Sequence, residues 1–492
     1  MPENASSVPE PAIGSSVALS MLGVNMMVLM ATLDMSIVNV SLPTLAASLG
    51  VDFATIQWVI LSYVVAIACL LLLISRLGDM MGKKRIFATG LIIFTASSLL
   101  CGLAPGAHWL IAFRALQGVG AAMSQALGIA IVTEIAPPGT RGRAIGFVGA
   151  TVSMGLALGP SVGGILIDLA GWRWIFLVNV PIGLLAMRIV AKYMPALPPS
   201  QARQRFDVPG AVVAAVTLGC YCLGMTLGQK TGFDQTGALS LLGLSVIGFA
   251  GFLMVERRTA QPMIDLSLFR NLRFSLNLLM SVLVFISLSG GFIVPFFLQM
   301  AQGRSPREVG LIMMVLPVCM GVFAMLSGSL SDRFGSRGLS ILGLATVGIG
   351  YLAMTGLTQD APWWEFVLRN CPVGIGIGLF QVPNNSAIMG AVPRERLGVA
   401  SGLLNYTRVF GQSTGMPLTG AIFTASVAGM TAMPTRADMT HVPPGQLVAA
   451  FCHTNAVLFF LAMAALALGI VVWRLDRTAK PQAASSKNTG AA

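Results

Sequence analysis

The chain has 492 residues, of which 55% are hydrophobic and only 10% charged, and its mean hydropathy is +0.81. Soluble domains carry about 25% charged residues, so this composition excludes an ordinary soluble globular protein. The net charge of +12 would suit a nucleic-acid-binding protein, but the basic residues lie between apolar stretches rather than in one cluster. We therefore expect a membrane protein with no nucleic-acid partner.

Apolar stretches of about 20 residues, each long enough to cross a bilayer as a helix, recur along the chain. They predict an all-α polytopic membrane protein with fourteen transmembrane helices. The first apolar run is too long for the core of a signal peptide, which indicates an uncleaved signal anchor. The spans are expected at residues 17–43, 54–75, 86–104, 108–134, 143–168, 172–191, 209–229, 237–255, 272–299, 308–330, 339–358, 363–391, 397–424 and 452–473.

The basic residues predict the orientation of the chain. With the N-terminus in the cytoplasm, most of the 30 Lys and Arg residues fall in cytoplasmic loops and tails. This positive-inside bias is typical of multi-pass membrane proteins, and an odd number of spans would remove it. We expect a multi-pass protein of the cell (inner) membrane with both termini cytoplasmic. The external loops hold Arg173, Lys230, Arg304, Arg307 and Arg436.

Two stretches of the chain repeat one pattern. Residues 75–85 read SRLGDMMGKKR and residues 328–337 read GSLSDRFGSR, with their Asp residues 253 positions apart. An Arg in an apolar run follows each Asp, after 35 residues at Arg114 and after 37 at Arg369. A Gly-x-x-x-Gly pair follows each Arg after a further 41 or 42 residues. Duplicated helical units around a ligand path are typical of secondary transporters.

The repeat predicts the domain organisation. Its offset exceeds the length of one six-helix unit by enough residues for a linker and one further helical pair. We expect a cytoplasmic N-terminal tail at 1–16, an N-terminal six-helix bundle at 17–191, a cytoplasmic linker at 192–208, an inserted two-helix segment at 209–271, a C-terminal six-helix bundle at 272–473 and a cytoplasmic tail at 474–492.

Five motifs, which together cover the chain from about residue 17 to residue 475, resemble those of the major facilitator superfamily. The resemblance is to its fourteen-span drug:proton antiporters of the multidrug resistance type, and it implies the major facilitator fold. The motifs are the loop signature at 75–85 and 328–337, the fourth-span motif Arg114-x-x-Gln117-Gly118-x-Gly120, the fifth-span antiporter motif Gly155-x-x-x-Gly159-Pro160-x-x-Gly163-Gly164, the first-span motif Leu33–Pro43 and the segment Trp172–Pro181.

Asp34 is the only carboxylate near the middle of an expected span. An ionised acid there costs about 2.5–3.5 kcal/mol, so it predicts a function, and we expect Asp34 to couple proton movement to transport. The alternative is a structural hydrogen-bonding group between helices. At helical spacing, Asn25, Thr32, Ser36 and Asn39 form a polar stripe on the face opposite Asp34. Either face can line a cavity, and Asn39 is a candidate cavity residue.

Two arginines at matching places in the repeats are further candidates. The resemblance implies that Arg114 takes part in proton relay, with Gln117 and Arg369 in the cavity or relay. The alternative is an Arg that holds backbone carbonyls of neighbouring helices. This alternative is favoured for Arg369, because Pro372 replaces the Gln of the motif, and also for Arg408 in the thirteenth span.

Asp79 and Asp332 lie where a span reaches the cytoplasm. A carboxylate there can meet the N-terminal end of a helix and a loop Arg such as Arg141 or Arg143. We expect these residues, with Arg333, to gate the cytoplasmic side; the alternative is a solvated turn.

Gly155, Gly159, Gly163 and Gly164 leave one helix face bare, and Pro160 permits a bend. The resemblance implies that this face packs between the two halves of an antiporter. Ordinary packing of small residues is the alternative.

These features predict a proton-coupled secondary active transporter that exports hydrophobic or amphipathic small molecules by alternating access. With one mid-span acid, we expect one proton per cycle and monovalent or neutral substrates. A dedicated metabolite, siderophore or sugar exporter of the same fold is the alternative. We expect a monomer that contacts lipid, draws energy from the proton gradient, and needs no cofactor or metal. No nucleophile, metal or paired-acid pattern indicates an enzyme.

Overall fold

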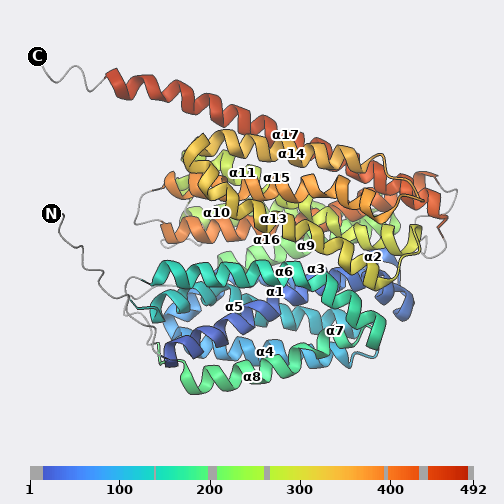
Figure 1. Ribbon diagram of the computed structural model, residues 1–492, viewed down its shortest axis with the longest axis horizontal. Helices are drawn as coiled ribbons and strands as arrows, with labels where there is room; N and C mark the ends of the chain where they lie inside the picture. The colour runs from blue at the N-terminus through green and yellow to red at the C-terminus, as the bar shows by residue number, and fades with distance from the viewer. Residues whose placement is uncertain are drawn as a thin grey trace, which may run out of the picture.

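The computed structural model describes residues 15–137, 140–197, 208–259, 266–392, 397–430 and 442–485. These residues form helices and connecting turns without strands. The long helices run side by side along one axis (Figure 1). Such an arrangement satisfies backbone hydrogen bonds within each helix, as the apolar core of a bilayer requires.

The N-terminal half is a bundle around α1, which contacts α5, α6 and α8. α1 continues as a helix through Pro43 and beyond the expected end of the first span. The elements of this half are α1 (Ser15–Leu49), α2 (Phe53–Ile56), α3 (Trp58–Met81), α4 (Lys83–Gly102), α5 (Ala107–Ile135), α6 (Arg141–Ala170), α7 (Trp174–Leu177) and α8 (Asn179–Tyr193).

The C-terminal half repeats this plan around α11. Asn271 caps α11 by accepting hydrogen bonds from the next backbone N–H groups, and Ser305 and Glu308 form a capping box at the start of α13. The elements are η1 (Leu266–Arg270), α11 (Leu272–Ser289), η2 (Gly290–Ile293), α12 (Val294–Phe296), η3 (Phe297–Ala301), α13 (Pro306–Phe334), α14 (Ser336–Met354), α15 (Trp363–Gly390), α16 (Leu397–Met430) and α17 (Pro444–Ser485).

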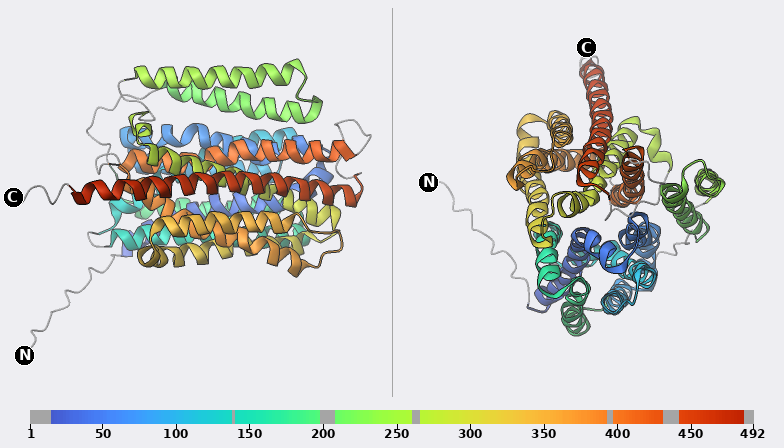
Figure 2. Two further views of the ribbon diagram at one scale, coloured as in Figure 1. Left: turned by 90° about the horizontal axis from the view of Figure 1, so that it is seen from above. Right: turned by 90° about the vertical axis from the view of Figure 1, so that its right-hand side faces the viewer.

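The inserted pair consists of α9 (Val208–Thr231) and α10 (Thr236–Arg258). It lies along one side of the molecule (Figure 2, green). α9 packs against α10 and also against α3 of the first half and α16 of the second. The insertion therefore covers one seam between the two bundles.

Twelve helices of the described residues are long and apolar enough to cross a membrane. α15 and α16 have 28 and 34 residues but are more polar, since they carry groups such as Asn370 and Arg408. Because both residues line a cavity described below, this polarity has a structural reason. The architecture is the expected pair of six-helix bundles plus two inserted helices, and it is consistent with fourteen spans.

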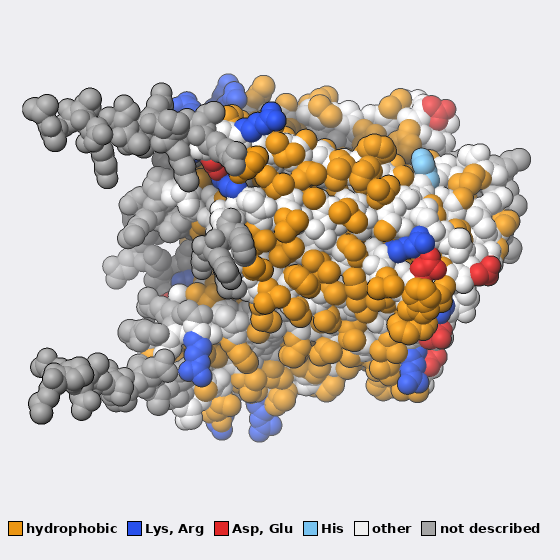
Figure 3. Space-filling model, turned by 45° about the horizontal axis from the view of Figure 1, so that its top comes forward, with side chains coloured by type: hydrophobic (Ala, Val, Ile, Leu, Met, Phe, Trp, Pro, Cys, Tyr) orange, Lys and Arg blue, Asp and Glu red, His pale blue; other side chains and the backbone are white. Residues whose placement is uncertain are grey.

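The surface has the pattern of a membrane protein. On the face shown in Figure 3, hydrophobic side chains cover the middle, and Lys, Arg, Asp and Glu lie toward the two ends. Large apolar side chains such as Leu169, Ile247 and Phe460 are more than two thirds exposed. A patch of this extent would be unstable in water and matches contact with lipid.

The two halves meet closely at the end of the molecule opposite the start of α1. A Cβ atom on Gly164 of α6 would lie 2.3 Å from the carbonyl oxygen of Pro306 at the start of α13. Thr44 donates a hydrogen bond to Gln299 of η3 (3.3 Å). Close contacts thus join the two halves at this end.

Candidate functional site

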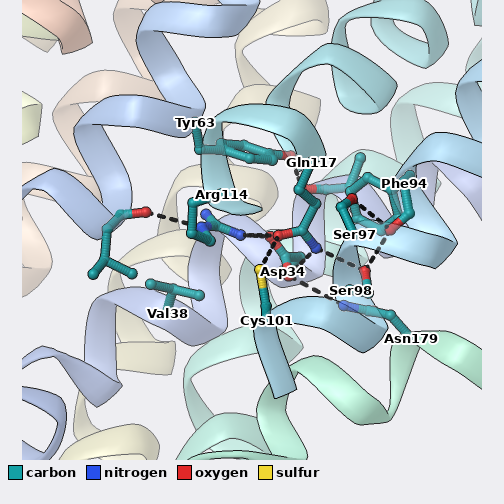
Figure 4. A network of polar contacts seen from close by, with 12 residues as sticks. Asp34, Val38, Tyr63, Phe94, Ser97, Ser98, Cys101, Arg114, Gln117 and Asn179 are labelled. Atoms are coloured by element: carbon teal, nitrogen blue, oxygen red, sulfur yellow. Dashed lines mark hydrogen bonds and ion pairs between the residues drawn. The ribbon is translucent and has the colours of Figure 1, made fainter. Parts of the chain in front are cut away.

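A buried ion pair lies inside the N-terminal half. Nη1 of Arg114, on α5, donates to Oδ2 of Asp34, on α1, over 2.5 Å, and both side chains are 0% exposed. Nε of Arg114 donates to the carbonyl oxygen of Val59 on α3 (2.8 Å). The guanidinium lies over the ring of Tyr63, 4.2 Å from its centroid. One cation thus joins three helices, as Figure 4 shows.

Asp34 accepts further hydrogen bonds through its other oxygen. Nε2 of Gln117 and Nδ2 of Asn179 donate to Oδ1 over 3.0 and 3.1 Å. Gln117 also donates to Oγ of Ser98 on α4 (2.8 Å) and accepts from Arg114 (2.6 Å). Residues of α1, α3, α4, α5 and α8 therefore form one polar network, which we call the Asp34 network.

The Asp34 network holds two opposite charges away from water. Removing water from two charges is costly, and only close contact with good hydrogen bonds offsets that cost. Here the carboxylate has a direct ionic partner and two amide donors. Loss of either charge would leave the other buried without its partner.

A cavity of about 340 Å³ lies between the halves. Most of its wall is apolar, with Phe and Met side chains, and amides and hydroxyls interrupt it. Volumes from about 300 Å³ upward are typical of pockets for small organic ligands. Polar lining residues include Thr32, Ser36 and Asn39 of α1, Gln125 of α5, Asn370 and Gln381 of α15, Arg408 and Gln412 of α16, and Asn455 of α17.

The structure decides which face of α1 lines this cavity. Thr32, Ser36 and Asn39 lie on its wall, whereas Asp34 points to the opposite side, into the Asp34 network. Oδ1 of Asn39 is buried and has no hydrogen-bond partner among the described residues. α1 therefore separates a charged interior from the cavity and contacts both.

The glycine motif of α6 divides between two partners. Cβ atoms on Gly155 and Gly159 would lie 2.1 Å from Oγ1 of Thr32 and 2.5 Å from Cβ of Ser36, so these glycines let α6 approach α1. Gly163 also faces α1, at Ile37. Gly164 instead faces α13, where a Cβ on Gly310 would lie 2.2 Å from the carbonyl oxygen of Pro160. Gly164 and Pro160 thus contact the other half, while the other three glycines pack within their own half.

Arg369 occupies a different setting from Arg114. Its Nη2 lies 2.5 Å from Oε1 of Glu365, one turn earlier on α15, and its Nη1 donates to the carbonyl oxygen of Ala353 (3.0 Å). Both charged side chains are partly exposed, and neither lines the cavity. This geometry favours the structural interpretation of Arg369. Gln117 likewise lies in the Asp34 network and away from the cavity wall.

The proposed gating residues are only partly described. The backbones at Asp79, Arg141, Asp332 and Arg333 belong to helices, but their side chains lie outside the described part. Arg143 is exposed at the start of α6.

Sequence reasoning missed several groups at these sites. Asn179 and Ser98 bind within the Asp34 network, and Arg408 lines the cavity. Asn179 had a sequence signal, because it is an amide within an apolar span of a quoted motif. Arg408 had the same kind of signal, a cation in a span without a nearby acid.

Comparison with known proteins places the chain in a family. The family model described as Major Facilitator Superfamily matches residues 24–294 and 278–491. The chain is 32% identical over 402 residues to the riboflavin transporter RibZ of Clostridioides difficile, covering 81% of this chain and 87% of that protein. It is 32% identical over 410 residues to the multidrug resistance protein Stp of Mycobacterium tuberculosis, covering 83% and 76%.

Two further similarities point to the same family. The tetracenomycin C resistance and export protein of Streptomyces glaucescens is 31% identical over 409 residues, covering 83% of this chain and 76% of that protein. Among solved structures, a bacterial homologue of the human lysosomal transporter Spinster, inward-facing and unoccupied, aligns with a TM-score of 0.70 over 94% of this chain and 98% of that one, at 17% identity. The chain thus belongs to the Major Facilitator Superfamily, with relatives that include multidrug resistance proteins.

Proposed function

We propose that this transporter exports hydrophobic or amphipathic small molecules in exchange for protons, by alternating access. The observation that carries the proposal is the double contact of α1. One face holds Asp34 in a buried ion pair, and the other lines the cavity between the halves. A change of charge at Asp34 is therefore adjacent to the wall that would hold a substrate.

The coupling step follows from the burial of the pair. Asp34 is 0% exposed, so a proton reaches it only after α1, α5 or their neighbours move. Once Asp34 is neutral, Arg114 keeps the carbonyl of Val59 and the amide of Gln117 but loses its counter-charge. We infer that this loss shifts the equilibrium between two arrangements of the halves. A shift of this kind requires different interaction energies in the two states, which the ion pair supplies.

The orientation belongs to the same proposal. From the positive-inside bias we infer that the start of α1 and the end of α17 lie on the cytoplasmic side of the membrane. The close contacts between the halves, such as that of Thr44 with Gln299, then lie at the external end. In this state the cavity would receive substrate from inside the cell. We further propose that a single chain is the working unit.

A second candidate is a transporter dedicated to one metabolite. The similarity to a protein named as a riboflavin transporter favours it. The two candidates differ in breadth rather than in mechanism. Two measurements separate them. One is the survival, on a panel of toxic compounds, of cells that lack their own pumps. The other is the uptake and efflux of radiolabelled riboflavin.

The test of proton coupling is transport in proteoliposomes under an imposed pH gradient. We expect Asp34→Asn to lose gradient-driven flux, since a neutral amide cannot exchange a proton, and to keep substrate exchange at equal pH. The matched control is Asp52→Asn, which removes the charge of a partly exposed acid that caps α2 and pairs with Lys230 over 3.3 Å. Gradient-driven flux that survives in Asp34→Asn at the level of Asp52→Asn would contradict the proposal.

A further inference from the structure

A cation lies on the wall of the central cavity. It is Arg408 of α16, which is half-buried. Among the described residues its side chain makes one hydrogen bond, a long one of 3.5 Å from Nη2 to Oε1 of Gln125, on α5 of the other half. A neutral amide at this distance does not compensate a guanidinium that has been removed from bulk water. No ion pair of Arg408 occurs within the described residues.

No acid among the described lining residues balances that charge. These residues include no Asp, Glu, Lys or His, so Arg408 is the one ionic side chain among them. Asp34, the mid-span acid of α1, faces away from the cavity and is already bound by Arg114, Gln117 and Asn179. The part of the wall where Arg408 meets Gln125 of the other half therefore has a positive electrostatic potential, with no counter-charge among the described residues.

The remainder of the wall suits an apolar body. Phe285, Phe292, Met313, Met416 and Phe451 line the cavity. Aromatic and Met side chains bind apolar groups of varied shape. Asn and Gln side chains nearby can donate or accept hydrogen bonds. The cavity thus combines an apolar surface with one fixed positive charge.

We propose that this cavity binds amphipathic organic acids, whose carboxylate pairs with Arg408 while the apolar part lies against the Phe and Met side chains. The planar guanidinium offers two parallel N–H donors to a carboxylate, a geometry that an amine lacks. The bound acid would replace the weak contact with Gln125 at the junction of the halves. This proposal deepens the proposed function and rests on it for the direction of transport.

The charge of the substrate has a consequence for energetics. When one monoanion leaves the cell and one proton enters it, the net result equals the inward movement of two positive charges. Both movements are favoured by a membrane potential that is negative inside. The same exchange with a monovalent cation would move no net charge. An anion-selective cavity therefore makes transport respond to the potential as well as to the pH gradient.

The experiment is equilibrium binding to the full chain in lipid nanodiscs at neutral pH. Two matched pairs serve as probes: dansylglycine with dansylglycinamide, and naphthoxyacetic acid with naphthoxyacetamide. Each pair differs only in the charge of one group, and empty nanodiscs correct for partition into lipid. We expect each acid to bind wild type about 10-fold more tightly than its amide, as a buried charged hydrogen bond implies.

Variants of Arg408 locate the preference. Arg408→Gln should reduce the acid-over-amide ratio to about 1 while amide affinity stays within about 3-fold, because the apolar contacts remain. Arg408→Lys should retain part of the preference, since the charge is kept and the two parallel donors are lost. Arg188→Gln removes a positive charge from the exposed surface of α8 and should bind like wild type. Amide binding also reports whether each variant is folded.

Two outcomes overturn the proposal. One is the absence of acid preference in both probe pairs, including the case in which no probe binds wild type. The other is an acid preference that persists in Arg408→Gln. Binding at equilibrium does not depend on proton exchange, so loss of the coupling role of Asp34 in proteoliposomes would leave this result unchanged. The two failures are therefore distinguishable.

Discussion

Arg114 and Arg369 occupy matching positions in the two repeats but have different surroundings. Arg114 is fully buried and pairs with an acid on another helix. Arg369 is 29% exposed and pairs with Glu365 of its own helix, one turn away. The N-terminal half thus encloses its charge in a network of five helices, whereas the C-terminal half leaves its charge near an end of α15. The comparison shows that one repeated position can hold a buried ion pair between helices in one half and a partly exposed pair within one helix in the other.

The largest expected difference between the halves is in stability. Arg114→Met should lower the free energy of unfolding by about 3–5 kcal/mol, because it leaves Asp34 buried without its cation. Arg369→Met should cost about 1 kcal/mol or less, since partly exposed pairs contribute little. Titration of the purified variants with SDS in mixed micelles measures both. Equal losses would mean that burial does not distinguish the two pairs.

Substitutions of closely packed glycines, by contrast, should lower stability by similar amounts in the two halves. A Cβ on Gly159 would lie 2.5 Å from Cβ of Ser36, and one on Gly415 would lie 2.7 Å from Cα of Ile286. Each Gly→Ala change should therefore cost about 1–3 kcal/mol by overpacking. Gly321→Ala, where a Cβ meets nothing within 4 Å, is the control and should be neutral or slightly stabilising. A large loss at one glycine only would show that the repeat is not preserved in this packing.

The inserted pair provides the smallest expected effect. Gln229 of α9 donates to the carbonyl oxygen of Pro417 on α16 (2.7 Å) and accepts from Gln57 of the first half (3.3 Å). Gln229→Leu removes both contacts and should weaken closure of the halves at that end by about 0.5–1.5 kcal/mol.

Cross-linking of Thr44→Cys with Gln299→Cys reports that closure, since these side chains hydrogen-bond across the seam. The yield should fall in Gln229→Leu. Thr231→Val, which removes a hydroxyl that bonds only to Leu227 of its own helix, should leave the yield unchanged. An unaltered yield in Gln229→Leu would mean that α9 does not stabilise the closed end.

Much of the fold could be predicted because hydropathy and repeats are local properties. The expected span at 86–104 corresponds to α4 at Lys83–Gly102, and the span at 108–134 to α5 at Ala107–Ile135. The gap between the expected spans at 397–424 and 452–473 is longer than the gap between the corresponding helices. α16 continues to Met430, and α17 begins at Pro444, because Pro is well tolerated in the first turn of a helix.

The sequence predicted the two charged residues of the site but not the residues that contact them. Asp34 and Arg114 are conspicuous in the sequence because each is a charge within an apolar run. Asn179 donates to Asp34 and Ser98 accepts from Gln117, and only the packing of α8 and α4 against α1 and α5 brings these residues together. For the same reason, the structural role expected for both Arg369 and Arg408 did not separate them, although Arg369 lies off the cavity and Arg408 lies on its wall.

By itself, the sequence determined that this protein lies in a membrane as two duplicated helical bundles with an inserted pair, because each span must bury its own backbone in lipid. It also determined that the first bundle carries a mid-span acid. Tertiary structure alone decided that Asp34 faces the bundle interior, that Thr32 and Asn39 face the cavity, and that Arg408 supplies its positive charge. The physical reason is that the direction of a side chain across a bundle depends on how helices distant in the chain rotate and pack, which no local pattern records.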